Sequence, residues 1–158
     1  MPHRHRAGAG FTLLELLVVL AVAAIAVTVV GVGVQTYLDR ARYQQTVRDL
    51  ASQLRQARAL SMDAGEPVLV SWRPQTRQVL VGAAPALDVP DSVVVHWQAV
   101  APAPRPVGPA GGEAIFLFDA NGGARGGQIE ISRGGLGVRF QVNWLLGTIE
   151  QAAVSVPS

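Results

Sequence analysis

The start of this sequence is dominated by a run without charge. No charged residue occurs from Leu16 to Leu38, and the apolar stretch that contains most of this run extends from Phe11 to Val34. As a helix its 24 residues are about 36 Å long, which is enough to cross the hydrocarbon core of a bilayer. No second run of about 18 apolar residues follows, which argues against a polytopic membrane protein. The stretch predicts one transmembrane helix over residues 11–34.

An acid interrupts the first part of this stretch at Glu15. A carboxylate-bearing side chain costs roughly 2.5–3.5 kcal/mol at the middle of a membrane and less near the interface, which indicates a functional residue. No basic residue lies between Ala7 and Asp39 to neutralise it. If the chain is cut after Gly10, the new cationic amine at Phe11 lies about 6 Å from Glu15 along a helix. We hypothesise that this amine, from the same chain or from a neighbour, neutralises Glu15.

The net positive charge of the chain comes from its first ten residues. Thirteen arginines and no lysine stand against eleven acids, which gives a net charge of +2. Arg4 and Arg6 account for that excess, and beyond them eleven basic residues face eleven acidic ones. We therefore expect no nucleic-acid partner. The absence of cysteine excludes disulfides, thiolate nucleophiles and cysteine-based metal sites.

The helix is predicted to continue past the membrane over residues 35–66. No proline interrupts residues 11–66, and Gly65 and Pro67 mark the end of the helix. In its second part the residues of one stripe recur every three or four positions, as expected of an amphipathic helix: Val47, Leu50, Leu54, Ala57 and Ser61. We expect this stripe to pack on the chain's own sheet rather than on a separate partner helix.

Beyond Pro67 the pattern changes to the alternation of β-strands, which predicts a β-rich head over residues 67–158. Residues 101–112 carry four prolines and are predicted to form an extended loop, and Gly122-Gly123 and Gly134-Gly135 are predicted to form turns. One long helix followed by antiparallel strands predicts an α+β domain. The predicted strands are Val68–Arg73, Arg77–Gly82, Ser92–Val100, Ala114–Asp119, Gln128–Arg133 and Gly137–Asn143.

Few residues carry the chemistry of an enzyme. His96 is the only histidine beyond the first ten residues, and without cysteine it is expected to be a structural or surface residue. The segment Asp119-Ala120-Asn121-Gly122 has part of a calcium-loop pattern but lacks the later bidentate acid, so a turn is expected. No G-x-S-x-G motif occurs. We predict a protein that is not an enzyme and that has no cofactor and no metal.

The first residues resemble a known family. The sequence Gly10-Phe11-Thr12-Leu13-Leu14-Glu15 and the apolar residues after it are similar to the class III leader and N-terminal helix of type IV pilins and type II secretion pseudopilins. The resemblance implies a leader over residues 1–10, which a prepilin peptidase removes after Gly10 before it N-methylates Phe11. It implies that Glu15 docks the subunit onto a helix bundle. It also implies a single-pass protein of the inner membrane with a cytoplasmic N-terminus and a periplasmic head.

The head resembles the GspH/FimT branch of minor pseudopilins, which implies a type IV pilin-like fold. The similarity lies in Phe116-Leu117-Phe118, in the block that ends Gly126-Gly127-Gln128-Ile129-Glu130-Ile131, and in the closing segment Val142–Ile149, where Leu146 replaces the usual threonine. The resemblance implies a structural subunit near the tip of a type II secretion pseudopilus. The implied partners are the major pseudopilin, other minor pseudopilins and, as a further candidate, secreted substrates.

Two other interpretations remain open at this stage. One is a FimT/FimU-like minor pilin that primes a type IV pilus or aids DNA uptake, although residues 140–158 contain no arginine or lysine for DNA binding. The other is an exported soluble domain released by an ordinary signal peptidase near Ala23. The segment that matches the family least, residues 83–112, is predicted to be a variable contact surface.

Overall fold

The computed structural model describes residues 12–98 and 112–155, and of residues 27–34 it describes the backbone alone. The predicted leader, the cleavage site between Gly10 and Phe11, and the methylated Phe11 lie outside these residues. The predicted proline-rich loop also lies outside them, except for Gly112. The chain divides into two compact units, residues 1–39 and residues 40–158.

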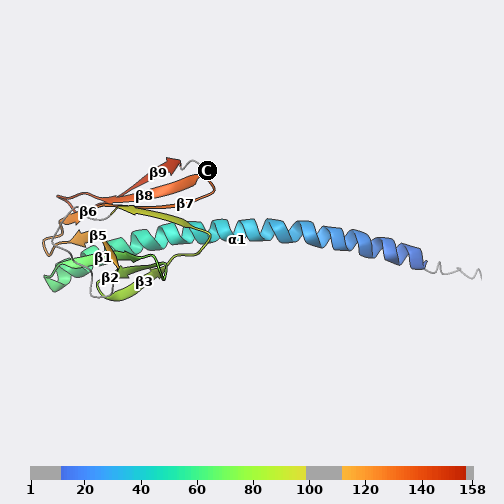
Figure 1. Cartoon of the computed structure of the whole chain (residues 1–158), viewed down its shortest axis with the longest axis horizontal. Helices are drawn as coiled ribbons and strands as arrows, with labels where there is room; N and C mark the ends of the chain where they lie inside the picture. The colour runs from blue at the N-terminus through green and yellow to red at the C-terminus, as the bar shows by residue number, and fades with distance from the viewer. Residues whose placement is uncertain (1–11, 99–111, 156–158) are drawn as a thin grey trace, which may run out of the picture. The chain divides into compact units, whose positions relative to one another are not determined.

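One helix, α1, spans Leu13–Ala64 and joins the two helical segments that the sequence predicts (Figure 1). It begins after Thr12, whose Oγ1 atom accepts a hydrogen bond from the Glu15 backbone N–H at 3.2 Å, the geometry of an N-cap. It ends at Gly65, whose φ of +68° is the left-handed conformation that commonly terminates helices.

The described strands of the head form two antiparallel sheets. The first sheet has the order β3-β2-β1-β5-β6, and the second has the order β4-β7-β8-β9. The positive φ angles of Gly134 and Gly135, at +58° and +81°, make the tight turn between β7 and β8 that the sequence predicts. The strands are β1 (Val68–Arg73), β2 (Gln78–Val81), β3 (Ala84–Asp88), β4 (Val94–Gln98), β5 (Glu113–Phe118), β6 (Ala124–Gly126), β7 (Gln128–Arg133), β8 (Leu136–Val142) and β9 (Ile149–Ser155).

Three of these strands are absent from the sequence prediction. β3 contains Pro85, which lacks the N–H that a central strand needs, and it occupies an edge of the first sheet. β6 has only three residues. β9 reads Ile-Glu-Gln-Ala-Ala-Val-Ser and is largely exposed, so it lacks the apolar alternation that identifies a half-buried strand. The predicted contact surface over residues 83–112 therefore includes β3 and β4 and ends just before β5.

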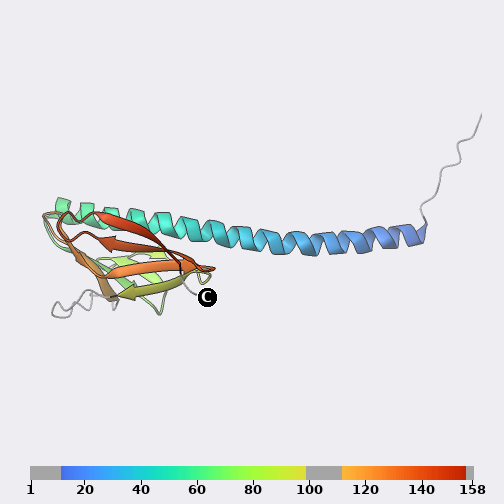
Figure 2. The same ribbon diagram turned by 90° about the horizontal axis from the view of Figure 1, so that it is seen from above.

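The second half of α1 belongs to the core of the head. Figures 1 and 2 show it running beside both sheets. The predicted stripe supplies Leu50, Leu54 and Ala57, which are all buried against apolar side chains of the sheets, so the expectation that it packs on the chain's own sheet is confirmed. The largest buried side chains on the two sheets are Trp72, Phe116 and Phe118 on the first and Ile129, Ile131 and Phe140 on the second.

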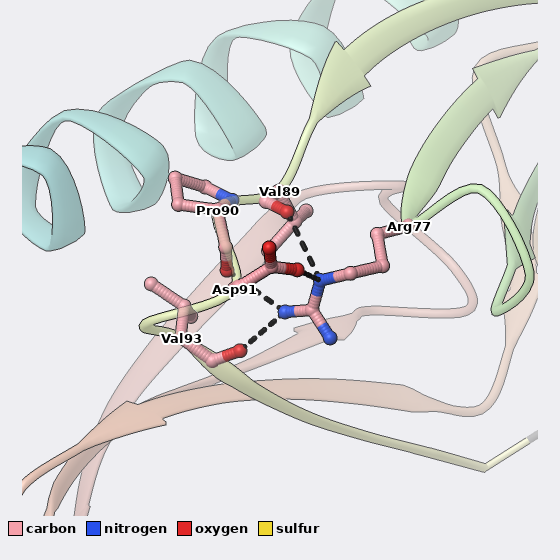
Figure 3. A network of polar contacts seen from close by, with 5 residues as sticks. All are labelled: Arg77, Val89, Pro90, Asp91 and Val93. Carbon is pink, nitrogen blue, oxygen red and sulfur yellow. Dashed lines mark hydrogen bonds and ion pairs between the residues drawn. The ribbon is translucent and has the colours of Figure 1, made fainter.

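Arg77 binds the segment between β3 and β4, where the chain passes from the first sheet to the second. It lies in the turn after β1 with a φ of +53°, and its side chain reaches the residues between β3 and β4 (Figure 3). Its Nε atom lies 3.2 Å from the Val89 carbonyl oxygen and 3.1 Å from the Asp91 carboxylate. Its Nη2 atom donates to the carbonyl oxygens of Pro90, at 2.8 Å, and Val93. One guanidinium thus satisfies three carbonyl groups of this crossing.

Candidate functional site

Glu15, the predicted docking acid, occupies the first turn of α1 with an exposed side chain. Thr12 at the N-cap and Glu15 three residues later form the T-x-x-E pattern of a capping box, a structural role for Glu15 beside the predicted docking role. An acid in the first turn also interacts favourably with the helix dipole. Glu15 therefore stabilises the start of the helix, whatever else it contacts.

The apolar side chains before and after Glu15 are exposed on every side of α1. Leu13 and Leu14 are 84% and 75% exposed, and Leu20 and Ile25 are 68% and 65% exposed. A helix that is apolar all round is normally buried against other apolar matter. In the part of the chain whose side chains are described, which leaves out residues 27–34, no helix is long and apolar enough to cross a membrane.

A second exposed apolar group lies in the turn between β8 and β9. Trp144, Leu145 and Leu146 follow one another there, and the indole is 75% exposed. The Asn143 side-chain oxygen accepts the backbone N–H groups of Leu145 and Leu146, each at 3.1 Å. The Gly147 N–H donates to the Asn143 carbonyl oxygen at 2.8 Å. The exposed side chains are therefore presented on a turn whose backbone is held by hydrogen bonds.

Contacts with the rest of the head hold this turn in place. Gly147 has a φ of +61°, and a Cβ atom added to it would lie 1.9 Å from the Gly122 carbonyl oxygen. That oxygen also accepts a hydrogen bond from Arg58 Nε at 3.0 Å, and the Ala124 N–H donates to the Trp144 oxygen at 3.2 Å. In the sequence, only Leu145-Leu146-Gly147 points to this turn. The contact with Gly122 could not be predicted, because Gly122 is distant in sequence.

A groove of about 420 Å³ lies between this turn, α1 and β9. Its polar lining includes the guanidinium side chains of Arg55 and Arg58 from α1 and the amide side chain of Gln151 from β9. Its apolar lining includes Met62 and Ile149, and none of its described lining residues is acidic. The groove suits a ligand that combines apolar groups with negative charge.

His96 and the segment from Asp119 are the other positions at which the sequence raised enzyme chemistry or metal binding. His96 is exposed on β4. The Gly122 N–H donates to the Asp119 carbonyl oxygen at 2.9 Å, and Gly122 has a φ of +82°, so the segment from Asp119 is the turn that the sequence predicts. Within the described residues, no group of three or more His, Cys, Asp or Glu side chains is placed to hold a metal ion.

Comparison with known proteins gives two matches. The family described as type II transport protein GspH matches residues 46–146, well over half of the chain. The prokaryotic N-terminal methylation motif matches residues 5–31. No curated protein and no solved structure gives a significant match. The GspH match covers residues 46–64 of α1 and the strands from β1 to β8, and the methylation motif includes Glu15. The chain therefore belongs to the GspH family of type II transport proteins, as a GspH/FimT-like pseudopilin with an α+β, type IV pilin-like fold.

Proposed function

We propose that this chain is a minor pseudopilin of the type II secretion system. In this role it is a structural subunit near the tip of the periplasmic pseudopilus and supports the export of folded proteins across the outer membrane. The observation that carries the proposal is the combination of a GspH-type head with a methylation motif in one chain. The apolar side chains exposed around the start of α1 support it, because a helix bundle or a membrane would cover them.

The parts of the chain take separate roles in this proposal. Residues 1–10 form the leader, which the prepilin peptidase removes between Gly10 and Phe11, and the same enzyme methylates the new amine of Phe11. Residues 11–34 anchor the subunit in the inner membrane, with the N-terminus in the cytoplasm and the head in the periplasm. Glu15 then docks the subunit by pairing with a terminal amine, since an unpaired carboxylate is costly in an apolar bundle.

The proposed partners are the major pseudopilin, other minor pseudopilins and, for the exposed head, secreted substrates. Residues 35–66 connect the anchor to the head, and residues 67–158 present the surfaces that neighbours contact. The turn at Trp144 supports this role, because three consecutive exposed apolar side chains on a fixed backbone are typical of a protein interface. No catalytic activity and no nucleic-acid binding are proposed.

The first experiment is N-terminal sequencing of the mature chain isolated from the membrane. We expect it to start at N-methylated Phe11. A start after Ala23 would instead identify an exported soluble domain.

The second experiment is deletion of the gene, which should block release of secreted proteins while twitching motility persists. Loss of twitching or of natural transformation, with normal secretion, would identify a FimT/FimU-like minor pilin of a type IV pilus. Complementation with the full chain is the control.

A further inference from the structure

The two sheets of the head differ in how their edges are protected. An edge strand presents unpaired N–H and C=O groups that another chain can pair with, and proteins usually protect such edges by proline, bulges or short strands. In the first sheet, β3 carries Pro85 and its pairing with β2 shifts register between Val79 and Leu80. At the other edge of that sheet, β6 has three residues. Both edges of the first sheet are therefore protected.

Strand β9, an edge of the second sheet, has none of these devices. It pairs with β8 over seven residues without a register shift, from Leu136 opposite Ser155 to Val142 opposite Ile149. It contains no proline, and its one charged residue is Glu150. It is thus a long and regular edge, the kind that accepts an added strand.

The hydrogen bonds of the β8–β9 pair indicate which groups of β9 face outward. The Asn143 N–H donates to the Thr148 carbonyl oxygen at 2.9 Å, in the same register as the β8–β9 pairing. In an antiparallel pair, hydrogen-bonded and non-hydrogen-bonded residues alternate. The residues of β9 whose N–H and C=O groups point away from β8 are therefore Ile149, Gln151, Ala153 and Ser155.

The face of β9 that points to the core is covered at Ile149, which packs against the core, and is open farther along the strand. Gln151 lies opposite Phe140, and residues directly opposite in an antiparallel pair have their side chains on the same face of the sheet. Phe140 is 0% exposed, yet Gln151 is exposed, and so is Ala153 on the same face. The core thus extends under β8 and reaches β9 only at Ile149, beside the groove that Arg55 and Arg58 line. A strand added to β9 would place alternate side chains in this groove.

We propose that β9 accepts an extended segment of a neighbouring pseudopilin subunit as an additional strand, and that a carboxylate on this segment binds Arg55 and Arg58. The partner's chemistry follows from the lining: apolar side chains fit beside Met62, and an acid pairs with guanidinium groups in a groove without described acids. The hydrogen bond from Arg58 Nε to Gly122 holds one guanidinium at the groove. The inference rests on the proposed function, because it takes the partner from the pseudopilus.

The test is photocrosslinking in secreting cells of the source organism. The full chain carries p-benzoylphenylalanine in place of Gln151, and mass spectrometry identifies the crosslinked peptide. We expect an adduct with an extended segment of another pseudopilin that contains an acidic residue. No adduct, or an adduct with a second copy of this chain, with an exported protein or with a helix, overturns the inference.

Two further variants in the crosslinking chain test the geometry. Ala153→Pro removes an outward N–H without breaking a bond to β8, and Ala153→Ser is its matched control because it keeps that N–H. Arg55→Glu reverses a charge on an exposed helix position and leaves the core intact. We expect Ala153→Pro and Arg55→Glu each to lower the adduct yield about tenfold. Ala153→Pro loses a backbone hydrogen bond to the added strand, and Arg55→Glu loses a hydrogen bond to the partner's carboxylate. Equal yields in Arg55→Glu and the parent overturn the proposed charge pairing.

The deletion experiment separates the two levels of the argument. If deletion blocks secretion and Gln151 gives no adduct, the pseudopilin function stands and the strand-addition inference is wrong. If deletion leaves secretion intact, the proposed function is wrong irrespective of the adduct.

Discussion

Replacing Gly147 by alanine should disrupt the turn that carries Trp144. Gly147 has a φ of +61°, a conformation that costs an L-residue about 1–2 kcal/mol. The added Cβ would also lie 1.9 Å from the Gly122 carbonyl oxygen, a distance that forces one of the two backbone segments to move. The added Cβ would also lie 2.8 Å from Arg58 Nε, so the hydrogen bond that Gly122 accepts from this atom at 3.0 Å is lost.

The two effects together set the expected magnitude. A hydrogen bond to a charged group contributes about 1.5–3 kcal/mol, and we take the lower part of that range because Arg58 is only partly buried. With the backbone term, Gly147→Ala should lower the free energy of unfolding by about 3 kcal/mol. Gly134→Ala is the matched control, because Gly134 has a φ of +58° but open space where its Cβ would lie. It should cost about 1–2 kcal/mol.

Urea unfolding of the full chain in detergent micelles, followed by tryptophan fluorescence, measures this difference. With a slope of about 1–3 kcal/mol per molar urea, an excess cost of about 1.5 kcal/mol moves the midpoint by about 0.5–1.5 M relative to Gly134→Ala. Equal midpoints for the two variants would refute the argument that the approach of Gly122 fixes the turn.

Three further predictions concern single side chains. Arg77→Ala should lower the free energy of unfolding by about 2 kcal/mol in the same assay, because three carbonyl groups and Asp91 lose their cation; an unchanged midpoint would contradict this. Glu15→Gln keeps a residue suited to the capping box but removes the charge, so the chain should insert into the membrane yet be missing from the sheared pseudopilus fraction; normal incorporation would count against docking. Burial raises the pKa of Tyr43 above 10.0, so the folded head keeps the phenol proton to higher pH than the unfolded chain does. The free energy of unfolding should therefore fall as the pH rises from about 10, and Tyr43→Phe should reduce this fall. An equal dependence of stability on pH in the two proteins would disprove the role of Tyr43.

Local patterns predicted the elements that pack on one face. The stripe at Leu50, Leu54 and Ala57 was readable because helical spacing and burial coincide there. The bounds of β1 and β7 match the prediction to the residue, since turn residues flank both strands. β9 was missed because its sequence does not alternate in polarity. It is an edge strand, and Gln151 and Ala153 on its inner face are exposed.

Candidate site residues could be predicted only where neighbouring residues of one segment form the feature. Glu15 was singled out because an acid is costly in an apolar run that spans a membrane, and its docking role stays a prediction. The fixed turn at Trp144 depends on Gly122, which is distant in sequence, and the groove at Arg55 depends on β9. Contacts of this kind join residues that no short motif contains.

The strand order also determines when the head can be completed. β4 follows β3 in the chain but belongs to the second sheet, where its partner is β7. In the first sheet, β1 likewise pairs with β5, which comes later in the chain. Pairings between residues far apart in sequence form slowly, because the chain loses loop entropy before the contacts stabilise it. In the proposed topology the last residues to leave the membrane are those that complete the second sheet. Under that proposal the head reaches its native state only after its C-terminal strands have been translocated, and until then the apolar faces of β1 and β5 lack the second sheet that covers them.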